Sequence, residues 1–180
     1  PKPFLPLVDN QPTFAQTLAR IAAPALFADP LIVARHDLLD LVRAALAGAR
    51  ARATTMVETR PIGTAFAIAA AGEMAAEDDP DRLLLVLAAD HLIRDTAGFH
   101  ATVSAALPAA RDGRIVIFGI PPTRPEPGYG YIRPGAPLDD GPLSAVAGFV
   151  EKPDVATAER LIVEGALWNS GNLLVRAGTL

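Results

Sequence analysis

The sequence predicts an α/β protein with an open, mostly parallel, twisted sheet that is flanked by helices. Short apolar runs alternate along the chain with longer amphipathic stretches. Most of the runs are apolar on both faces, which is typical of strands in a buried parallel sheet. Hydrophobic residues make up 51% of the 180 residues. Many of them are alanine, which favours helices packed closely against a sheet.

The predicted elements alternate regularly. Predicted strands cover residues 31–34, 54–57, 82–89, 114–120 and 145–150, and predicted helices cover 12–23, 37–49, 64–77, 96–111 and 154–164. Asp95 and Asp154 are candidate N-caps of the last two helices, because a short polar side chain can accept hydrogen bonds from the first turn. This order favours right-handed crossovers between strands of one open sheet.

Residues 121–144 break this alternation, because nearly half of them are proline or glycine. A loop of this length inside a compact domain is typically functional or disordered. Its segment GYGYIRPG, residues 128–135, predicts either tight turns or a backbone that a ligand approaches closely. We expect one of its tyrosines to pack under the loop and the other to face the site, and the sequence does not say which. The chain is therefore one domain with a conspicuous insertion.

Composition excludes several classes of function. A net charge of -4 argues against broad electrostatic binding to nucleic acid or to anionic membranes. The chain has no cysteine, which excludes disulfides, thiolate metal sites and cysteine nucleophiles. The longest apolar run, at 83–89, is far below the ~20 residues of a membrane span. We expect a cytoplasmic protein with no nucleic-acid or membrane partner, and assembly into a homo-oligomer stays open.

Ligands of open α/β sheets collect at the carboxyl ends of the strands, so polar residues there are candidates for chemistry. Asp90 follows the most hydrophobic run, and its carboxylate suits Mg²⁺; the alternative is that Asp90 only begins the next loop. Gly63, Thr64 and Ala65 open a predicted helix, where backbone N–H groups can approach a ligand. An ordinary capped helix would show the same residues.

Two more segments carry polar residues of this kind. Glu151 and Lys152 end a predicted strand, and adjacent residues of an extended chain point to opposite sides, so we expect them on different faces. Solvated surface charges are the alternative. Asn169 lies beside Trp168, the single tryptophan of the chain, and an amide next to an aromatic ring suits a sugar. The alternative is that Trp168 belongs to the core.

Taken together, these segments resemble the mannose-1-phosphate guanylyltransferases, within the nucleotide-sugar pyrophosphorylases. The matching segments are PKPFLPL (1–7), ETRPIGTAFAIAAA (58–71), LLLVLAADHLIRD (83–95), FGIPPTRPEPGYGYIRPG (118–135), FVEKPDVATAERL (149–161) and LWNSGNLLVRAGTL (167–180). The resemblance implies a Rossmann-like nucleotidyltransferase domain over 1–180, incomplete at both ends, with 121–144 as a substrate-loop insertion.

The resemblance also implies a reaction and its residues. GTP and mannose 1-phosphate would give GDP-mannose and pyrophosphate, with Mg²⁺ as the cofactor. The matching positions are Lys2 and Asp90 for catalysis, with Asp90 also binding the metal, Gly63, Thr64 and Ala65 for the nucleotide, and Gly130, Glu151, Lys152, Asn169 and Gly171 for the sugar phosphate.

The sequence also departs from the family pattern. The glycine-rich loop expected before the PK pair is absent because the chain begins at Pro1, and a second metal-binding aspartate is expected beyond Leu180. Ile62 and Phe66 stand where the family has other residues near the base, and Ala88 replaces a proline. Two alternatives therefore stay open: a pyrophosphorylase for another nucleotide or sugar 1-phosphate, and a non-catalytic regulatory subunit that binds a nucleotide sugar.

Overall fold

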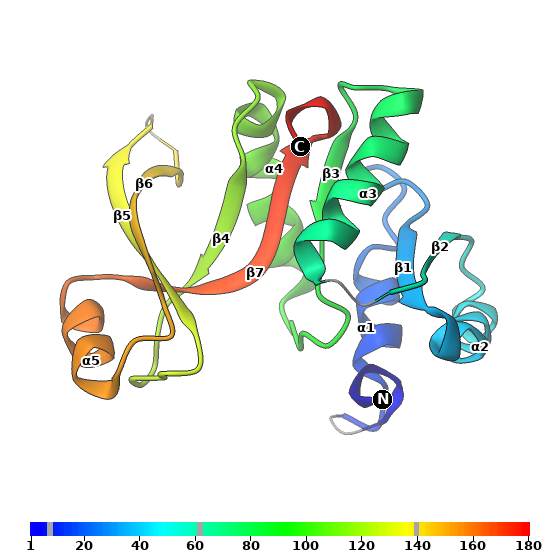
Figure 1. The fold of residues 1–180 in the computed structure, drawn as a ribbon, viewed down its shortest axis with the longest axis horizontal. Helices are drawn as coiled ribbons and strands as arrows, with labels where there is room; N and C mark the ends of the chain where they lie inside the picture. Colours follow the sequence, from blue (N-terminus) through cyan, green and yellow to red (C-terminus); the bar gives the residue numbers. More distant parts are fainter. Residues whose placement is uncertain (7–8, 61–62, 139–140) are drawn as a thin grey trace.

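The computed structural model describes residues 1–6, 9–60, 63–138 and 141–180, and Figure 1 shows the arrangement of its elements. The helices are α1 (Thr13–Arg20), α2 (Leu39–Ala49), α3 (Thr64–Asp78), α4 (Thr96–Arg111) and α5 (Val155–Val163). The strands are β1 (Leu31–Arg35), β2 (Thr54–Glu58), β3 (Leu83–Val86), β4 (Val116–Ile120), β5 (Gly130–Pro137), β6 (Ser144–Glu151) and β7 (Leu167–Arg176). Short 3-10 turns, η1 (Lys2–Phe4), η2 (His36–Leu38) and η3 (Ala177–Thr179), complete the described secondary structure. The predicted α/β class is confirmed.

The strands form two sheets. β1 and β2 pair in parallel, and a five-stranded sheet contains β3 to β7. Strand β7 runs antiparallel to β3, β4 and β5, and β5 runs antiparallel to β6. Because β3 and β4 both run against β7, they point in the same direction with β7 between them. The strands β3 and β4, which the sequence predicted for a parallel sheet, therefore run in the same direction. The antiparallel ladders that β7 forms with them were not predicted from the sequence.

Strand β7 is the organising strand of the larger sheet. Trp168 pairs with Ile120 of β4 and also with Tyr131 of β5, so β4 and β5 lie on opposite edges of β7. Leu173 pairs with β4 and with Val86 of β3, so β3 lies on the same edge as β5. Residues 169–172 of β7 consequently face the space between the end of β3 and the start of β5.

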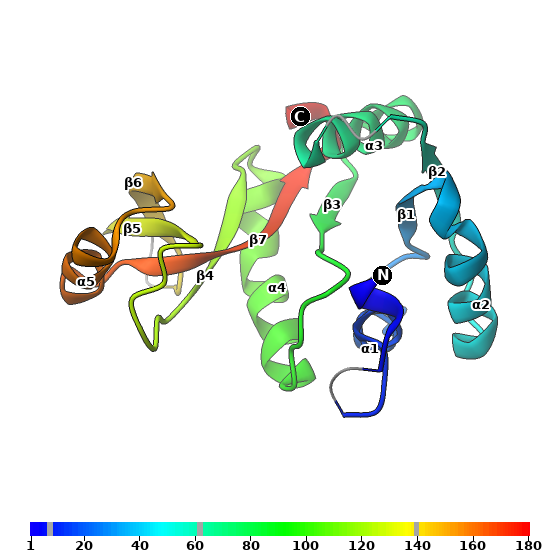
Figure 2. The ribbon, with the colours of Figure 1, turned by 60° about the horizontal axis from the view of Figure 1, so that its bottom comes forward.

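Helices α3 and α4 lie on opposite sides of the strands β3 and β7 in both Figure 1 and Figure 2. Phe118 packs against the cluster that α4 forms with the sheet. Ile120 lies two residues further along β4, so it points to the same face as Phe118, and its partner Trp168 packs against α5. Helices α4 and α5 therefore cover the same face of the sheet, and the other face is open beside α3.

Both predicted N-caps are confirmed. Asp95 accepts a hydrogen bond from the N–H of Gly98 at 2.8 Å, and Asp154 accepts one from the N–H of Thr157 at 2.7 Å. Helix α4 covers the predicted range 96–111. Such caps satisfy N–H groups that have no partner inside the helix, which is why these two helix starts were readable from the sequence.

Two predicted elements differ from the structure. The predicted strand 82–89 ends at Val86, and the range 121–144, predicted as an insertion, contains the strand β5. The proline and glycine content of that range concealed a strand, and β5 carries Pro134 and Pro137 at irregular points of its ladder with β6. In the described parts of the chain, no helix is both long and apolar enough to cross a membrane.

Candidate functional site

A row of residues across the open face of the larger sheet contains several of the predicted site residues. Asn169 pairs with Gly119 of β4, and Gly130 of β5 pairs with Glu151 of β6. The β5–β7 ladder pairs Tyr131 with Trp168, and continuing this register by one residue brings Gly130 alongside Asn169. Directly opposed residues in neighbouring strands share a face. The sheet thus aligns Gly119, Asn169, Gly130 and Glu151, which we call the substrate row.

The two glycines of the substrate row make room for neighbouring side chains. A Cβ atom added to Gly130 would lie 2.6 Å from Cζ of Phe149 and 2.7 Å from Oε2 of Glu151. A Cβ atom added to Gly119 would lie 2.5 Å from Cδ1 of Leu167. Since real Cβ atoms do not approach other atoms so closely, a larger residue at either position would force the neighbouring side chains to shift. Phe149 and Leu167 both lie in the neighbouring row, on either side of Ile132.

Trp168 is a core residue, as the alternative interpretation held. It is 9% exposed and packs with Tyr131 and Leu161 in the cluster between the sheet and α5. Adjacent residues of a strand point to opposite faces, so Trp168 and Asn169 lie on opposite sides of the sheet. Both residues nevertheless line one cavity of the structure.

Asn169 and Gly171 belong to an irregularity in the middle of β7. The β4–β7 ladder shifts register between Ile117 and Gly119. Gly171 has φ +75, a left-handed conformation that favours glycine, and within the described residues open space surrounds the position of its missing Cβ. Its N–H donates to Oδ1 of Asn169 at 3.1 Å. Because Oδ1 of Asn169 faces Gly171, the NH₂ group of the same amide points away from Gly171.

Asn172 is a structural residue of the site that the sequence reasoning missed. It is 6% exposed, and its Oδ1 accepts a hydrogen bond from the N–H of Ala88 at 3.1 Å. This bond connects the irregular part of β7 to the segment that leads from β3 to Asp90. The sequence did contain a signal for this role, because a polar residue inside an apolar strand pattern must find a buried hydrogen-bond partner.

Glu151 and Lys152 lie closer together than the sequence predicted. Lys152 has φ +45, so the chain is not extended there and the expected separation onto opposite faces is wrong. Its Nζ lies 3.4 Å from Oε1 of Glu151, and its N–H donates to the carbonyl of Tyr129 at 3.1 Å. Two residues after Lys152, Asp154 caps the start of α5, and the hydrogen bond from the Thr157 N–H lowers the pKa of the Asp154 carboxyl below its ordinary value. The turn therefore places a carboxylate and an ammonium group together at the end of the substrate row.

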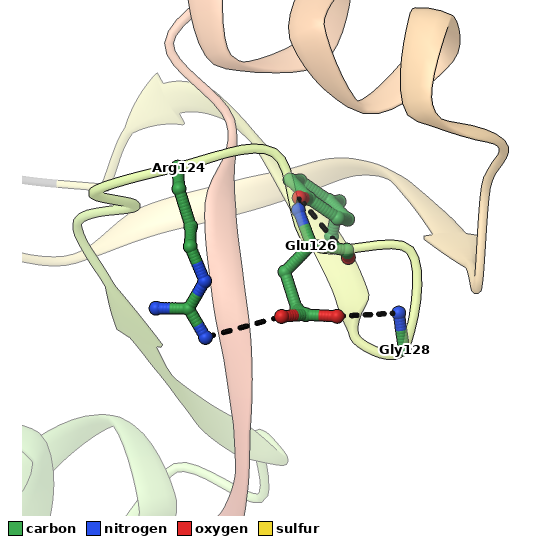
Figure 3. Close-up of polar contacts among 4 residues, drawn as sticks. Arg124, Glu126 and Gly128 are labelled. Atoms are coloured by element: carbon green, nitrogen blue, oxygen red, sulfur yellow. Dashed lines mark hydrogen bonds and ion pairs between the residues drawn. The ribbon is translucent and has the colours of Figure 1, made fainter.

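The loop before β5 is held by Glu126, as Figure 3 shows. The carboxylate of Glu126 accepts from the N–H of Gly128 at 3.2 Å and pairs with Arg124 at 3.1 Å. The hydroxyl of the fully buried Tyr131 accepts from the N–H of Glu126 at 2.9 Å and donates to its carbonyl at 3.3 Å. Tyr131 is thus the tyrosine under the loop, and Tyr129 is 45% exposed.

A cavity of about 680 Å³ extends from the segment after β3 to the start of β5. Asp90, Asn169 and Tyr129 line it, together with Phe99 of α4. Its lining also includes Trp168 and Ile120, which point to the face covered by α4 and α5. Of the predicted site residues, the cavity brings together Asp90 and Asn169, and Asn169 also belongs to the substrate row.

The predicted nucleotide residues lie on another part of the fold. Gly63 precedes α3 with φ +109, and Thr64 and Ala65 form the exposed first residues of that helix. The helix start predicted at this glycine is confirmed. Lys2 is exposed in η1, which Phe4 anchors to Phe14 of α1 through ring centroids 5.0 Å apart. Neither segment lines the cavity, and Ile62 lies outside the described residues.

Asp90 is the residue that could hold a divalent cation. Its carboxylate is exposed in the turn after β3 and lines the cavity. Among the described residues, no group of three or more acidic, histidine or cysteine side chains forms a preassembled metal site. A single carboxylate fits Mg²⁺, because this ion is commonly bound by one or two carboxylates together with substrate phosphates and water.

The open sheet, the antiparallel β7 and the polar row beside it define an α/β protein with a candidate ligand site at the sheet. The family model described as nucleotidyl transferase matches residues 1–180. The chain therefore belongs to the nucleotidyl transferase family.

Individual relatives agree with this assignment. The chain is 44% identical to the xanthan biosynthesis protein XanB of Xanthomonas campestris pv. campestris (strain B100), over 98% of the chain and 38% of that protein. It is 37% identical to the mannose-1-phosphate guanylyltransferase of Klebsiella pneumoniae, with the same coverage of both chains. A crystal structure described as mannose-1-phosphate geranyltransferase from Thermus thermophilus matches 99% of the chain and 51% of its own, with a TM-score of 0.89 and 34% identity. The chain thus spans about 38% of the length of the curated relatives it matches.

Proposed function

We propose that the protein transfers a nucleotidyl group from GTP to mannose 1-phosphate and thereby forms GDP-mannose and pyrophosphate. The observation that carries this proposal is the substrate row, in which an amide and a carboxylate lie on an open sheet face with the ammonium group of Lys152 at its end. Amides and carboxylates bind sugar hydroxyls, and an ammonium group binds phosphate. Membership of the nucleotidyl transferase family supports the reaction class, and the name of the Klebsiella relative supports the substrates.

In the proposed reaction, a phosphate oxygen of mannose 1-phosphate attacks the α-phosphorus of GTP. A new P–O bond forms there, the bond between the α-phosphorus and the bridging oxygen breaks, and pyrophosphate leaves with the electron pair. The attacking oxygen is already anionic, so no general base is needed. The protein therefore has to align two anions and offset their charge. We assign Lys152 to the sugar phosphate and Lys2 to the triphosphate or the departing pyrophosphate.

We assign the metal to Asp90, and a bound Mg²⁺ would offset negative charge on the phosphates. Gly63, Thr64 and Ala65 are assigned to the base, because the exposed start of α3 presents backbone N–H groups that no residue of the helix can accept from. Gly130 and Gly171 are assigned to the surroundings of the hexose, beside Asn169 and Glu151. The Asn172 bond to Ala88 supports this arrangement, since it ties the segment of Asp90 to the strand of Asn169.

Pyrophosphate release by the full-length protein tests the proposal. GTP, ATP and UTP are each combined with mannose 1-phosphate and with other hexose 1-phosphates, in the presence of Mg²⁺. We expect the highest kcat/KM for GTP with mannose 1-phosphate. Preference for another pair would support the alternative pyrophosphorylase, and binding without pyrophosphate release from any pair would support the regulatory subunit.

A further inference from the structure

Phe149 is an exposed aromatic residue on the same sheet face as the substrate row. It is 47% exposed, in the edge strand β6. Phe149 lies two residues before Glu151, so both side chains project from the same face of the strand. Ligand sites commonly combine apolar and aromatic side chains with a small number of convergent polar groups.

The structure holds the ring of Phe149 in a defined place. Its Cζ and Cε1 atoms lie 2.6 Å and 3.2 Å from the position that a Cβ of Gly130 would occupy. The ring therefore lies over Gly130, on the side of β5 that carries the Glu151 carboxylate. Ile132 of β5 pairs with Phe149, so the two side chains lie together in the row next to the substrate row. Ile132 is only 5% exposed.

The mixture of groups around the ring matches the chemistry of a hexose. A pyranose has an apolar face of C–H groups and a rim of hydroxyl groups. Phe149 supplies an apolar surface, while Asn169 and Glu151 supply a hydrogen-bond donor and an acceptor beside it. Lys152 lies one residue beyond Glu151, at the end of the row where a phosphate on C1 of the sugar would be met.

We propose that Phe149 is a specificity-determining residue whose ring forms the apolar floor beneath the hexose of the sugar phosphate. This inference rests on the proposed function, because it assigns the sugar to the substrate row. In the proposed complex, Phe149 and Leu167 of the neighbouring row contact the sugar ring, and Lys152 contacts only the phosphate. A side chain at position 130 would displace the ring and the Glu151 carboxylate together.

Titration calorimetry with two ligands, mannose 1-phosphate and inorganic phosphate, separates the contact to the sugar ring from the contact to the phosphate. In Phe149→Ala, we expect mannose 1-phosphate to bind about tenfold more weakly, which is the usual effect of losing an apolar contact with a substrate. Inorganic phosphate should bind as it does to the wild type. Lys152→Ala should weaken the binding of both ligands, because it removes the cation that meets the phosphate.

Val146→Ala is the matched control, since Val146 is 51% exposed in the same strand and lies outside the substrate row. It should leave both affinities unchanged. Phe149→Leu keeps an apolar side chain without the ring, and we expect a loss smaller than that of Phe149→Ala. This second variant also tests the proposal if Phe149→Ala fails to fold. Thermal unfolding of each variant identifies any loss of folded protein.

Unchanged affinity of mannose 1-phosphate in Phe149→Ala and Phe149→Leu would overturn the inference, as would an equal loss for inorganic phosphate. The calorimetry contains no nucleotide, so it is independent of turnover. If the full-length protein releases no pyrophosphate while sugar binding depends on Phe149, the proposed function fails and the inference stands. If turnover with mannose 1-phosphate is observed and Phe149 has no effect, the inference fails and the proposed function stands.

Discussion

The two faces of the sheet at β7 differ sharply although they are built from the same strands. On one face, Trp168 and Tyr131 pair across β7 and β5 and pack under α5. On the other face, one residue further along, Asn169 lies between two glycines whose missing side chains leave space for Phe149 and Leu167. Large buried side chains on one face hold the strands in register, which allows small residues and polar groups on the other.

This comparison assigns different roles to neighbouring residues. Substitutions on the buried face should lower the free energy of unfolding, because they leave cavities or unpaired polar groups. Substitutions on the open face should change ligand binding with a smaller effect on stability.

Trp168→Ala should lower the free energy of unfolding by about 3–5 kcal/mol, because a buried aromatic side chain is replaced by a cavity. Denaturation in urea measures the change. Asn169→Ala, one residue away on the open face, is the control and should cost about 1 kcal/mol, the net contribution of its hydrogen bond to Gly171. Similar costs for the two variants would mean that the faces do not differ in this way.

Gly130→Ala should disturb the open face. The added Cβ would collide with Phe149 and Glu151, so both side chains must move. We expect a stability loss of at most about 0.5 kcal/mol, because the displaced side chains are flexible and exposed, and a clear rise in the KM for mannose 1-phosphate. Gly48→Ala is a suitable control, because no described residue comes within 4 Å of its added Cβ and it lies inside α2. An unchanged KM in Gly130→Ala would remove Gly130 from the site.

Tyr131→Phe should cost about 1 kcal/mol of stability, because it removes the hydroxyl that bonds both backbone groups of Glu126. Tyr129→Phe removes a hydroxyl from a half-exposed ring and should change stability by less than about 0.5 kcal/mol. Chemical denaturation of the two variants provides the comparison. Equal losses would show that the loop is not anchored through Tyr131.

The cap of α5 predicts a small effect of pH. The pKa of Asp154 is lowered in the folded state, chiefly by the hydrogen bond from the Thr157 N–H. Its contribution to stability is therefore complete above the unfolded pKa of about 3.9 and is lost as the pH falls through the lower folded value. Asp154→Asn keeps a cap without this titration. The difference in Tm between wild type and this variant should shrink on acidification, and a difference that grows instead would contradict the assignment.

Much of the fold was readable from the sequence because its signals are local. The caps at Asp95 and Asp154 and the apolar runs of β1 to β4 depend on neighbouring residues alone. Strand β7 was not predicted, because the polar segment Asn169 to Asn172 interrupts its apolar pattern. That segment is stable in a strand only through long-range partners, such as the Ala88 N–H that bonds Asn172.

The candidate site was predicted in part for the same reason. Gly130, Glu151 and Asn169 were selected as ligand residues, and the structure aligns them in one row. Their common face could not be inferred, because it depends on the register of three strands that are distant in the sequence. Phe149 and Gly119 were missed because an exposed aromatic residue and a glycine acquire their meaning only from what lies opposite them.

In the proposed complex, the sugar phosphate binds on the face of Asn169 and not on the face of Trp168. Nuclear magnetic resonance of the isotopically labelled protein tests it most directly, because the single tryptophan gives one indole N–H signal. On addition of mannose 1-phosphate, we predict a shift of the side-chain amide signal of Asn169 and an unchanged indole signal. A shift of the indole signal with an unchanged Asn169 amide would contradict the account.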